Sequence, residues 1–153
     1  MQHCDVLMAK LAEPVHVHWP EYLMEAAGLG LFMISAAVVT ATLEYPHSPL
    51  HYLFPDATVR RILIGLAMGL TAIGLIYSPW GKRSGAHLNP AVTVTFFRLG
   101  KMKGGDAFWY VASQFVGRTI GLWLAAQILG LAIEHPAVNY VVTVPGPQGT
   151  AIA

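Results

Sequence analysis

Charged residues and cysteines are scarce in this chain. Of its 153 residues only 11% are charged, whereas 55% are hydrophobic. A soluble domain usually carries about 25% charged residues, so a chain this apolar requires a solvent other than water. The single cysteine, Cys4, excludes an internal disulfide and any site built from several cysteines.

The sequence also lacks the features of a nucleic acid-binding protein or an enzyme. Its net charge is only +1, and phosphate binding needs a concentrated basic face. It contains no nucleophile–base pair, no phosphate loop and no paired metal-ligand spacing. These absences argue against the alternative of an intramembrane enzyme that uses Glu25, His87 and Arg118. We therefore predict no enzyme, no cofactor, no metal and no nucleic acid partner.

Three apolar runs are long enough to cross a lipid bilayer, because about 20 helical residues cover its hydrocarbon core of about 30 Å. They occupy approximately residues 22–43, 62–79 and 107–133. The first run is longer than the apolar part of a signal peptide, and only Lys10 precedes it. We predict an all-α membrane protein with three retained transmembrane helices.

Basic residues set the expected orientation. They gather between the second and third runs, at Lys82, Arg83, Arg98, Lys101 and Lys103. Because cytoplasmic loops are enriched in Lys and Arg, residues 81–105 and the N-terminus are expected on the cytoplasmic side. Residues 1–19 fit either a short interfacial helix or a mobile tail. Residues 134–153 are rich in proline and glycine, and we interpret them as a connecting loop.

Glycines recur at a spacing that suits close helix contacts. Gly65 and Gly69 are four residues apart, as are Gly117 and Gly121. Small residues at this spacing let two helix backbones approach closely in a membrane. The same pattern also arises from the general enrichment of glycine in membrane helices.

The segment 84–98 is apolar but too short to span. Asn89 is a preferred helix N-cap and Pro90 is favoured at the first helical position. A helix from Pro90 to Arg98 covers about half of the membrane core. We predict a re-entrant segment, in which a loop enters from the cytoplasmic side and a half-helix returns to it. The half-helix would point its positive dipole end and Asn89 toward the membrane centre, which suits a neutral hydrogen-bonding solute and repels cations.

The run from Ser84 to Thr93, SGAHLNPAVT, resembles the first signature loop of the major intrinsic protein family, the aquaporins and glycerol facilitators. The resemblance extends over about residues 20–150. Three further segments are similar to family patterns: Glu25-Ala26-Ala27-Gly28, Ala67-Met68-Gly69 and Ser113-Gln114-Phe115-Val116-Gly117.

The resemblance implies a channel for passive movement of water or small neutral solutes, tetrameric and in the plasma membrane. Asn89 resembles the residue that donates a hydrogen bond to the solute, and Glu25 the carboxylate that braces the pore loop. The remaining implied positions are the half-helix contacts Pro90 and Ala91, the carbonyl ladder of Gly85, Ala86, His87 and Leu88, and the selectivity candidates Met68 and Gly69. Glu25 could instead complement its helix dipole, the His87 side chain could be packed away from the pore, and Met68 could face lipid or the core.

Two features depart from the family pattern. Arg118 falls near the middle of the third run, where the family usually has a small residue, and a central arginine costs about 2.5–3.5 kcal/mol unless it pairs or faces water. It could mark a changed bundle interior or a sequence no longer under constraint.

The second departure is the number of repeats. The family has six spans and two signature loops related by an inverted repeat, whereas this chain has three spans and one loop. A second repeat is therefore expected for a pore, and we interpret the chain as a fragment or a truncated product. The alternative is a non-conducting half-module that pairs with or interferes with a complete channel.

Overall fold

The computed structural model describes residues 2–142, with side chains from residue 16 onward, and this part of the chain is helical without strands. In chain order the elements are α1 (Gln2–Glu44), α2 (Pro49–Leu53), α3 (Ala57–Tyr77), α4 (Pro79–Ser84), α5 (Pro90–Arg98), α6 (Gly104–Leu129), α7 (Leu131–Glu134) and a 3-10 turn (Asn139–Val141). Residues 143–153, most of the predicted connecting loop, lie outside the described residues.

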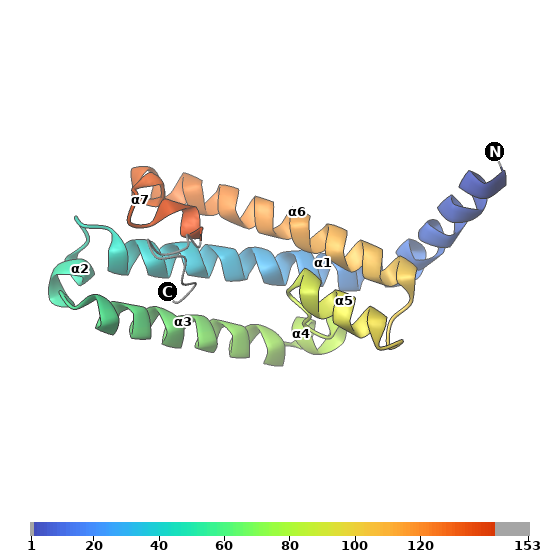
Figure 1. Ribbon diagram of the computed structural model, residues 1–153, viewed down its shortest axis with the longest axis horizontal. Coiled ribbons are helices and arrows are strands. Elements are labelled where there is room, and N and C mark those ends of the chain that lie inside the picture. The colour runs from blue at the N-terminus through green and yellow to red at the C-terminus, as the bar shows by residue number, and fades with distance from the viewer. Residues whose placement is uncertain (1, 143–153) are drawn as a thin grey trace, which may run out of the picture.

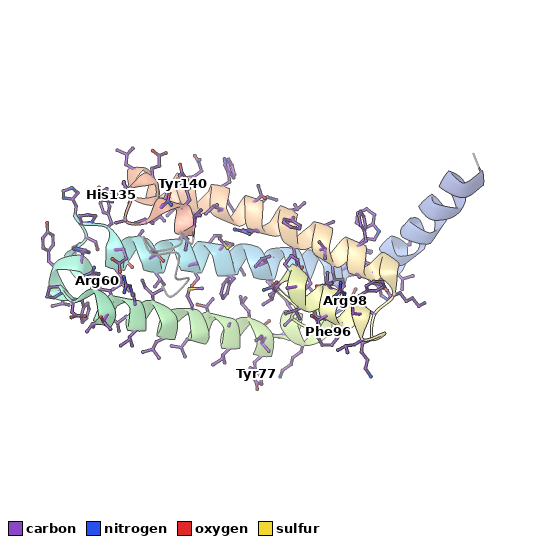
Figure 2. All side chains as sticks on the ribbon, in the orientation of Figure 1. Arg60, Tyr77, Phe96, Arg98, His135 and Tyr140 are labelled. Carbon is purple, nitrogen blue, oxygen red and sulfur yellow. The ribbon has the colours of Figure 1, made fainter. Side chains whose placement is uncertain are left out.

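The three long helices run side by side, with α1 between α6 and α3 (Figure 1). The short helices occupy the two ends: α2 and α7 lie at one end, and α4 and α5 at the other. Arg98 on α5 and Arg60 near α2 mark these opposite ends in Figure 2. The basic segment that connects the second and third long helices therefore lies at the α5 end.

Two of the described helices are long and apolar enough to cross a membrane, over His16–Glu44 and Ala57–Tyr77. The third, α6, has 26 residues and reaches about 39 Å at 1.5 Å per residue. Its length suffices, but Asp106, Gln114 and Arg118 make it more polar than the other two. A membrane crossing by α6 therefore stays a prediction.

The first helix begins at Gln2 rather than near Tyr22. Residues 2–19, expected as a separate tail, continue the first span as one helix. Figure 1 shows the first turns bending away from the axis of the rest of α1. Pro14 and Pro20 lack the N–H that continues the hydrogen-bond ladder, and prolines are the usual cause of such kinks.

Helices α1 and α6 meet backbone to backbone at glycines. A Cβ atom on Gly117 would collide with the carbonyl oxygen of Ala26, and one on Gly121 with that of Gly30. By contrast, a Cβ atom on Gly65 or Gly69 of α3 would meet no atom within 4 Å. Of the two glycine pairs, the one on α6 makes a helix contact in the described part of the chain. The core toward the α7 end is likewise built from small side chains, which are Ala37, Ala41 and Ala125, closed by Ile133 and Val138.

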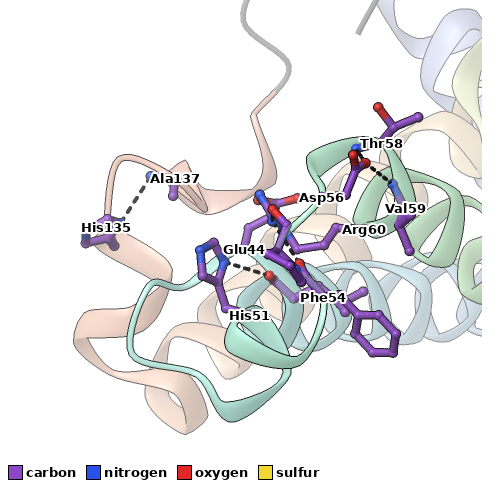
Figure 3. A network of polar contacts seen from close by, with 11 residues as sticks. Glu44, His51, Phe54, Asp56, Thr58, Val59, Arg60, His135 and Ala137 are labelled. Atoms are coloured by element: carbon purple, nitrogen blue, oxygen red, sulfur yellow. Dashed lines mark hydrogen bonds and ion pairs between the residues drawn. The ribbon is translucent and has the colours of Figure 1, made fainter.

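A buried arginine ties α1 to the start of α3 (Figure 3). Arg60 donates a hydrogen bond from Nε to Oε2 of Glu44 at 3.1 Å, and its Nη2 forms an ion pair with the same oxygen at 3.1 Å. Its Nη1 donates to the carbonyl oxygens of Phe54 and Pro55 at 3.0 and 2.9 Å. One side chain thus satisfies two loop carbonyls and one carboxylate, which holds the α2–α3 corner against the end of α1.

The N-cap of α3 makes a pH-dependent contribution to stability. Oδ1 of Asp56 accepts hydrogen bonds from the backbone N–H groups of Val59 and Thr58 at 3.0 and 2.7 Å. These bonds lower the pKa of the Asp56 carboxyl below its usual value. Because the pKa is lower in the folded chain than in the unfolded one, this contribution is present at neutral pH and is lost as the pH falls through the folded pKa.

We therefore expect an Asp56→Asn variant to match the parent at pH 7 and to lose less stability in acid. Asparagine is as good an N-cap as aspartate but does not titrate. Melting temperatures in detergent, compared between pH 7 and about pH 3, measure the difference. Equal acid losses in the parent and the variant would contradict this role of Asp56.

Candidate functional site

The loop between α4 and α5 has an unusual backbone. Gly85 ends α4 with φ +87°, and two non-glycine residues, Ala86 and Leu88, have φ +45° and +47°. Left-handed backbone costs a non-glycine residue roughly 1–2 kcal/mol, and it persists where the surroundings hold it. The loop must therefore be held from outside itself.

Glu25 of α1 is the group that holds the loop. Its side chain is fully buried. Oε1 accepts hydrogen bonds from Ser84 Oγ at 2.8 Å and from the His87 N–H at 2.9 Å. Oε2 accepts from the Leu88 N–H at 2.7 Å and from Gln114 Nε2 at 2.8 Å. One carboxylate thus fixes the two left-handed stretches of the loop and ties them to α6.

A second layer of buried hydrogen bonds joins α5 to α6. Gln114 Nε2 also donates to Thr93 Oγ1 at 3.1 Å, and His87 Nδ1 lies 3.1 Å from the same hydroxyl. Thr93 and Gln114 are both fully buried. The side-chain amide oxygen of Gln114, Oε1, is buried and has no hydrogen-bond partner among the described residues. The half-helix is therefore anchored by its inner face to α6.

The imidazole of His87 is packed inside the protein. It stacks on Phe96 with ring centroids 4.7 Å apart, and lies 5.2 Å from the ring of Tyr110. The Tyr110 hydroxyl donates to the Ser84 carbonyl at 2.7 Å. His87 is 9% exposed, so its side chain supports the loop and only its backbone is available to line a path.

Asn89 starts α5 and stands at its exposed tip. Its Oδ1 accepts from the Ala91 N–H at 2.8 Å, and its backbone carbonyl accepts from the Thr93 N–H at 3.1 Å. Asn89 and Ala91 are exposed, and Pro90 is partly exposed. The helix that follows has nine residues, about half of what a span needs.

A hollow of about 210 Å³ opens beside this tip. It is lined by Leu29, Phe32, Met33, Leu88, Asn89, Pro90, Gln114, Phe115 and Arg118. The sequence-predicted pore residues Leu88, Asn89 and Pro90 come together here with Arg118, which the sequence analysis identified as a departure from the family pattern. Met68 and Gly69 lie on α3 and do not line this hollow.

Sequence reasoning did not assign the partners of Glu25. Ser84 and Gln114 lie 59 and 89 residues from Glu25 along the chain, and Thr93 and Tyr110 complete the network. The one available signal was the segment Ser113–Gly117, which resembles a family pattern without revealing what it contacts. Local spacing cannot show which distant side chains meet.

Comparisons with known proteins agree with this architecture. The model of the Major intrinsic protein family matches residues 14–148. The probable aquaporin AqpM of Archaeoglobus fulgidus is 39% identical over 88 residues, which are 58% of this chain and 32% of that protein. Aquaporin NIP1-1 of Arabidopsis thaliana is 41% identical over 76 residues, 50% of this chain and 25% of that protein. Human aquaporin-5 is 40% identical over 68 residues, 44% and 25% of the two chains.

No solved structure matches the chain, which spans a third or less of the length of these curated relatives. The family match nevertheless runs from the apolar part of α1 past the 3-10 turn, and it includes the braced loop and the half-helix. The helical structure and the family match both agree with an all-α, aquaporin-like membrane architecture. The chain belongs to the major intrinsic protein family.

Proposed function

We propose that this chain forms one wall of a channel for passive movement of water or small neutral solutes across a membrane. The observation that carries this proposal is the exposed tip of α5, where Asn89 faces a hollow on a loop braced by a buried carboxylate. At the level of the family, the chain belongs with channels rather than enzymes. Its relatives carry the name aquaporin.

The tip is suited to bind a neutral solute transiently. Because Asn89 Oδ1 is occupied by the Ala91 N–H, its amide NH₂ is the group left to donate to a solute oxygen. The N-terminus of α5 adds a partial positive charge at the same place. A solute that accepts a hydrogen bond is stabilised there, whereas a cation is repelled. The carbonyls of residues 85–88 would accept the solute's hydrogens on its approach.

The bracing network gives this site its rigidity. Glu25 and Gln114 hold the loop through buried hydrogen bonds within the protein, so the positions of Leu88 and Asn89 do not depend on the solute. A site whose donors are already oriented loses little free energy in reorganisation when a solute arrives. Passage then requires binding that is favourable enough to enter and weak enough to leave.

A single wall does not close a pore, so the proposal includes a second repeat in inverted orientation, from the same or another polypeptide. Large apolar side chains on α3 are exposed and would face lipid or that second wall. They are Ile62, Leu66, Leu70, Ile73, Ile76 and Tyr77. We further infer a plasma membrane location, a cytoplasmic N-terminus and a tetramer, which rest on the basic segment 81–105 and on the family.

An Asn89→Asp variant tests the proposal. The chain is fused to the remaining sequence of the Archaeoglobus fulgidus probable aquaporin AqpM and placed in vesicles. Aspartate keeps the N-cap but puts an acid beside the solute path. We expect water flux to fall, or cation permeability to rise, by on the order of tenfold, which corresponds to about 1.4 kcal/mol at the tip.

Osmotic swelling and cation current in these vesicles are the measurements. Asn139→Asp is the matched control, because Asn139 lies in the 3-10 turn away from the hollow, and it should behave as the parent. A well-inserted fusion protein without water flux would sink the channel proposal and favour a non-conducting half-module. Equal fluxes in Asn89→Asp and the parent would remove Asn89 from the solute path.

A further inference from the structure

Arg118 contributes the one charged side chain among the residues that line the hollow at the α5 tip. We propose that Arg118 is a charge-selectivity residue of the channel, whose fixed positive charge beside Asn89 excludes cations and protons. This inference deepens the proposed function and rests on it. It gives a role to the arginine that departs from the family pattern.

The position of Arg118 follows from the bracing network. Arg118 comes four residues after Gln114 on α6, so the two side chains share a helix face. Gln114 is fully buried and hydrogen-bonded to Glu25 and Thr93. This anchors the face of α6 that looks toward the half-helix, and places Arg118 at the hollow that Asn89 also lines.

The charge of Arg118 is not neutralised within the described part of the chain. No ion pair joins it there, and no acidic side chain lines the hollow. The nearby carboxylate of Glu25 is buried and occupied by four donors. Glu134 lines a second hollow of about 620 Å³ along α6, together with Arg118, and its carboxylate accepts from the Tyr140 hydroxyl at 3.2 Å. An arginine stays protonated under all ordinary conditions, so it brings a full positive charge to the tip.

An unpaired arginine at membrane depth needs water around it. The hollow supplies this environment, since the exposed polar residue Asn89 also lines it. Arg118 is exposed and lines the hollow together with Asn89, so we place its charge beside the proposed solute path.

Two positive features then act at one place. The α5 N-terminus carries about half an elementary charge, and Arg118 adds a whole one. Fields in a narrow path with low-dielectric walls are screened much less than on an open surface. A cation that reaches Asn89 meets repulsion from both, whereas water meets only hydrogen-bond donors.

The test uses the vesicles described above, with whichever form of the protein conducts water. Arg118→Met removes the charge and keeps the side-chain length, and Arg118→Lys keeps the charge. Reversal potentials in salt gradients and dye-reported proton flux give the ratio of cation to water permeability. We expect Arg118→Met to raise this ratio by on the order of tenfold, as the loss of one poorly screened unit charge implies.

We expect Arg118→Lys to stay near the parent. Arg98→Met is the matched control, because Arg98 lies at the other end of α5 and does not line the hollow; its ratio should equal that of the parent. A purely structural role of Arg118 would change expression or total flux but not the reversal potential.

A second variant keeps the test decisive if Arg118→Met fails to insert. Arg118→Cys, in a Cys4→Ser background, is modified either with an aminoethyl or with a methyl methanethiosulfonate. The charged adduct should restore cation exclusion in the same folded protein, and the neutral adduct should not.

Unchanged cation exclusion in Arg118→Met, or an Arg118→Lys variant as leaky as Arg118→Met, would overturn the inference and leave the channel itself intact. A parent without water flux would overturn the proposed function and this inference with it.

Discussion

Replacing Glu25 with leucine is expected to destabilise the protein by about 3–5 kcal/mol, the range for removing one partner of a buried charged network. The substitution removes the acceptor of two backbone N–H groups, at His87 and Leu88, which have no second acceptor among the described residues. Each buried donor left unpaired costs about 1–3 kcal/mol. The left-handed residues Ala86 and Leu88 also lose the bonds that hold them.

The loss should appear as a lower melting temperature in detergent and as new proteolytic cleavage between α4 and α5. The melting temperature of Glu25→Gln should lie between those of the parent and Glu25→Leu. The amide oxygen of glutamine can accept two of the four hydrogen bonds, but its NH₂ group would face the other two donors and cannot accept from them. Water flux in the fusion protein should fall with both substitutions, since Asn89 follows the braced loop directly.

Glu21→Gln is the matched control for this experiment. Glu21 lies one turn before Glu25 on α1 and bonds to Arg83, which is 57% exposed. The Glu21 side chain is only 18% exposed, but its partner lies largely in solvent. Such a pair contributes about 0–1 kcal/mol, so this variant should remain close to the parent. A Glu25→Leu variant as stable as Glu21→Gln, with no new cleavage, would show that the loop holds its shape without the carboxylate.

Replacing Gly117 with valine is expected to separate α1 from α6. A Cβ atom at this position collides with the backbone carbonyl of Ala26, and backbone cannot move aside as a flexible side chain can. Overpacking usually costs about 1–3 kcal/mol and occasionally more. We expect Gly117→Val to lose stability at or above the upper end of this range. Gly117→Ala should have a stability between those of Gly117→Val and the parent.

The effect should reach the loop. Ala26 adjoins Glu25, and Gly117 follows Gln114 by one turn, so a wider gap between the helices stretches the 2.8 Å hydrogen bond from Gln114 Nε2 to Glu25 Oε2. Cleavage between α4 and α5 in Gly117→Val would report this coupling, alongside the lower melting temperature.

Gly69→Val and Gly69→Ala are the controls, because a Cβ atom on Gly69 meets no atom within 4 Å. Alanine there should be neutral or stabilising by up to about 1 kcal/mol, since it is the better helix former. If Gly69 and Gly117 variants lost the same stability, close contact of α1 and α6 would not be what the glycine provides.

Elements whose cause is local could be predicted from the order of the amino acids alone. An apolar run without charges predicts a span wherever it occurs, and α1 and α3 meet that criterion. Asn89 before Pro90 predicts a helix start for reasons of capping alone, and α5 begins at Pro90 with Asn89 as its cap. The run from Ser84 to Thr93 was specific enough to indicate the family, which the match over residues 14–148 shows.

Helix boundaries and helix–helix contacts were harder to predict from the sequence. Residues 1–19 were expected to form either a short interfacial helix or a mobile tail, but α1 begins at Gln2 and continues through Pro14 and Pro20 with a bend. The two glycine pairs look alike in sequence, yet only the one on α6 meets another backbone in the described part of the chain. Spacing predicts that a contact is permitted, and the arrangement of the helices decides whether it is made.

The contacts of the polar residues became apparent only in the folded protein. Glu25, Ser84, Thr93 and Gln114 are far apart in the chain, and a carboxylate on a membrane helix has many possible partners until folding brings a few of them within hydrogen-bond distance. Arg118 is similar: its sequence position signals only a cost in lipid, whereas the fold places it at the hollow beside Asn89. Hydrophobicity and capping act between neighbours along the chain, but buried hydrogen bonds and charges act between residues that only the packing of α1, α5 and α6 brings together.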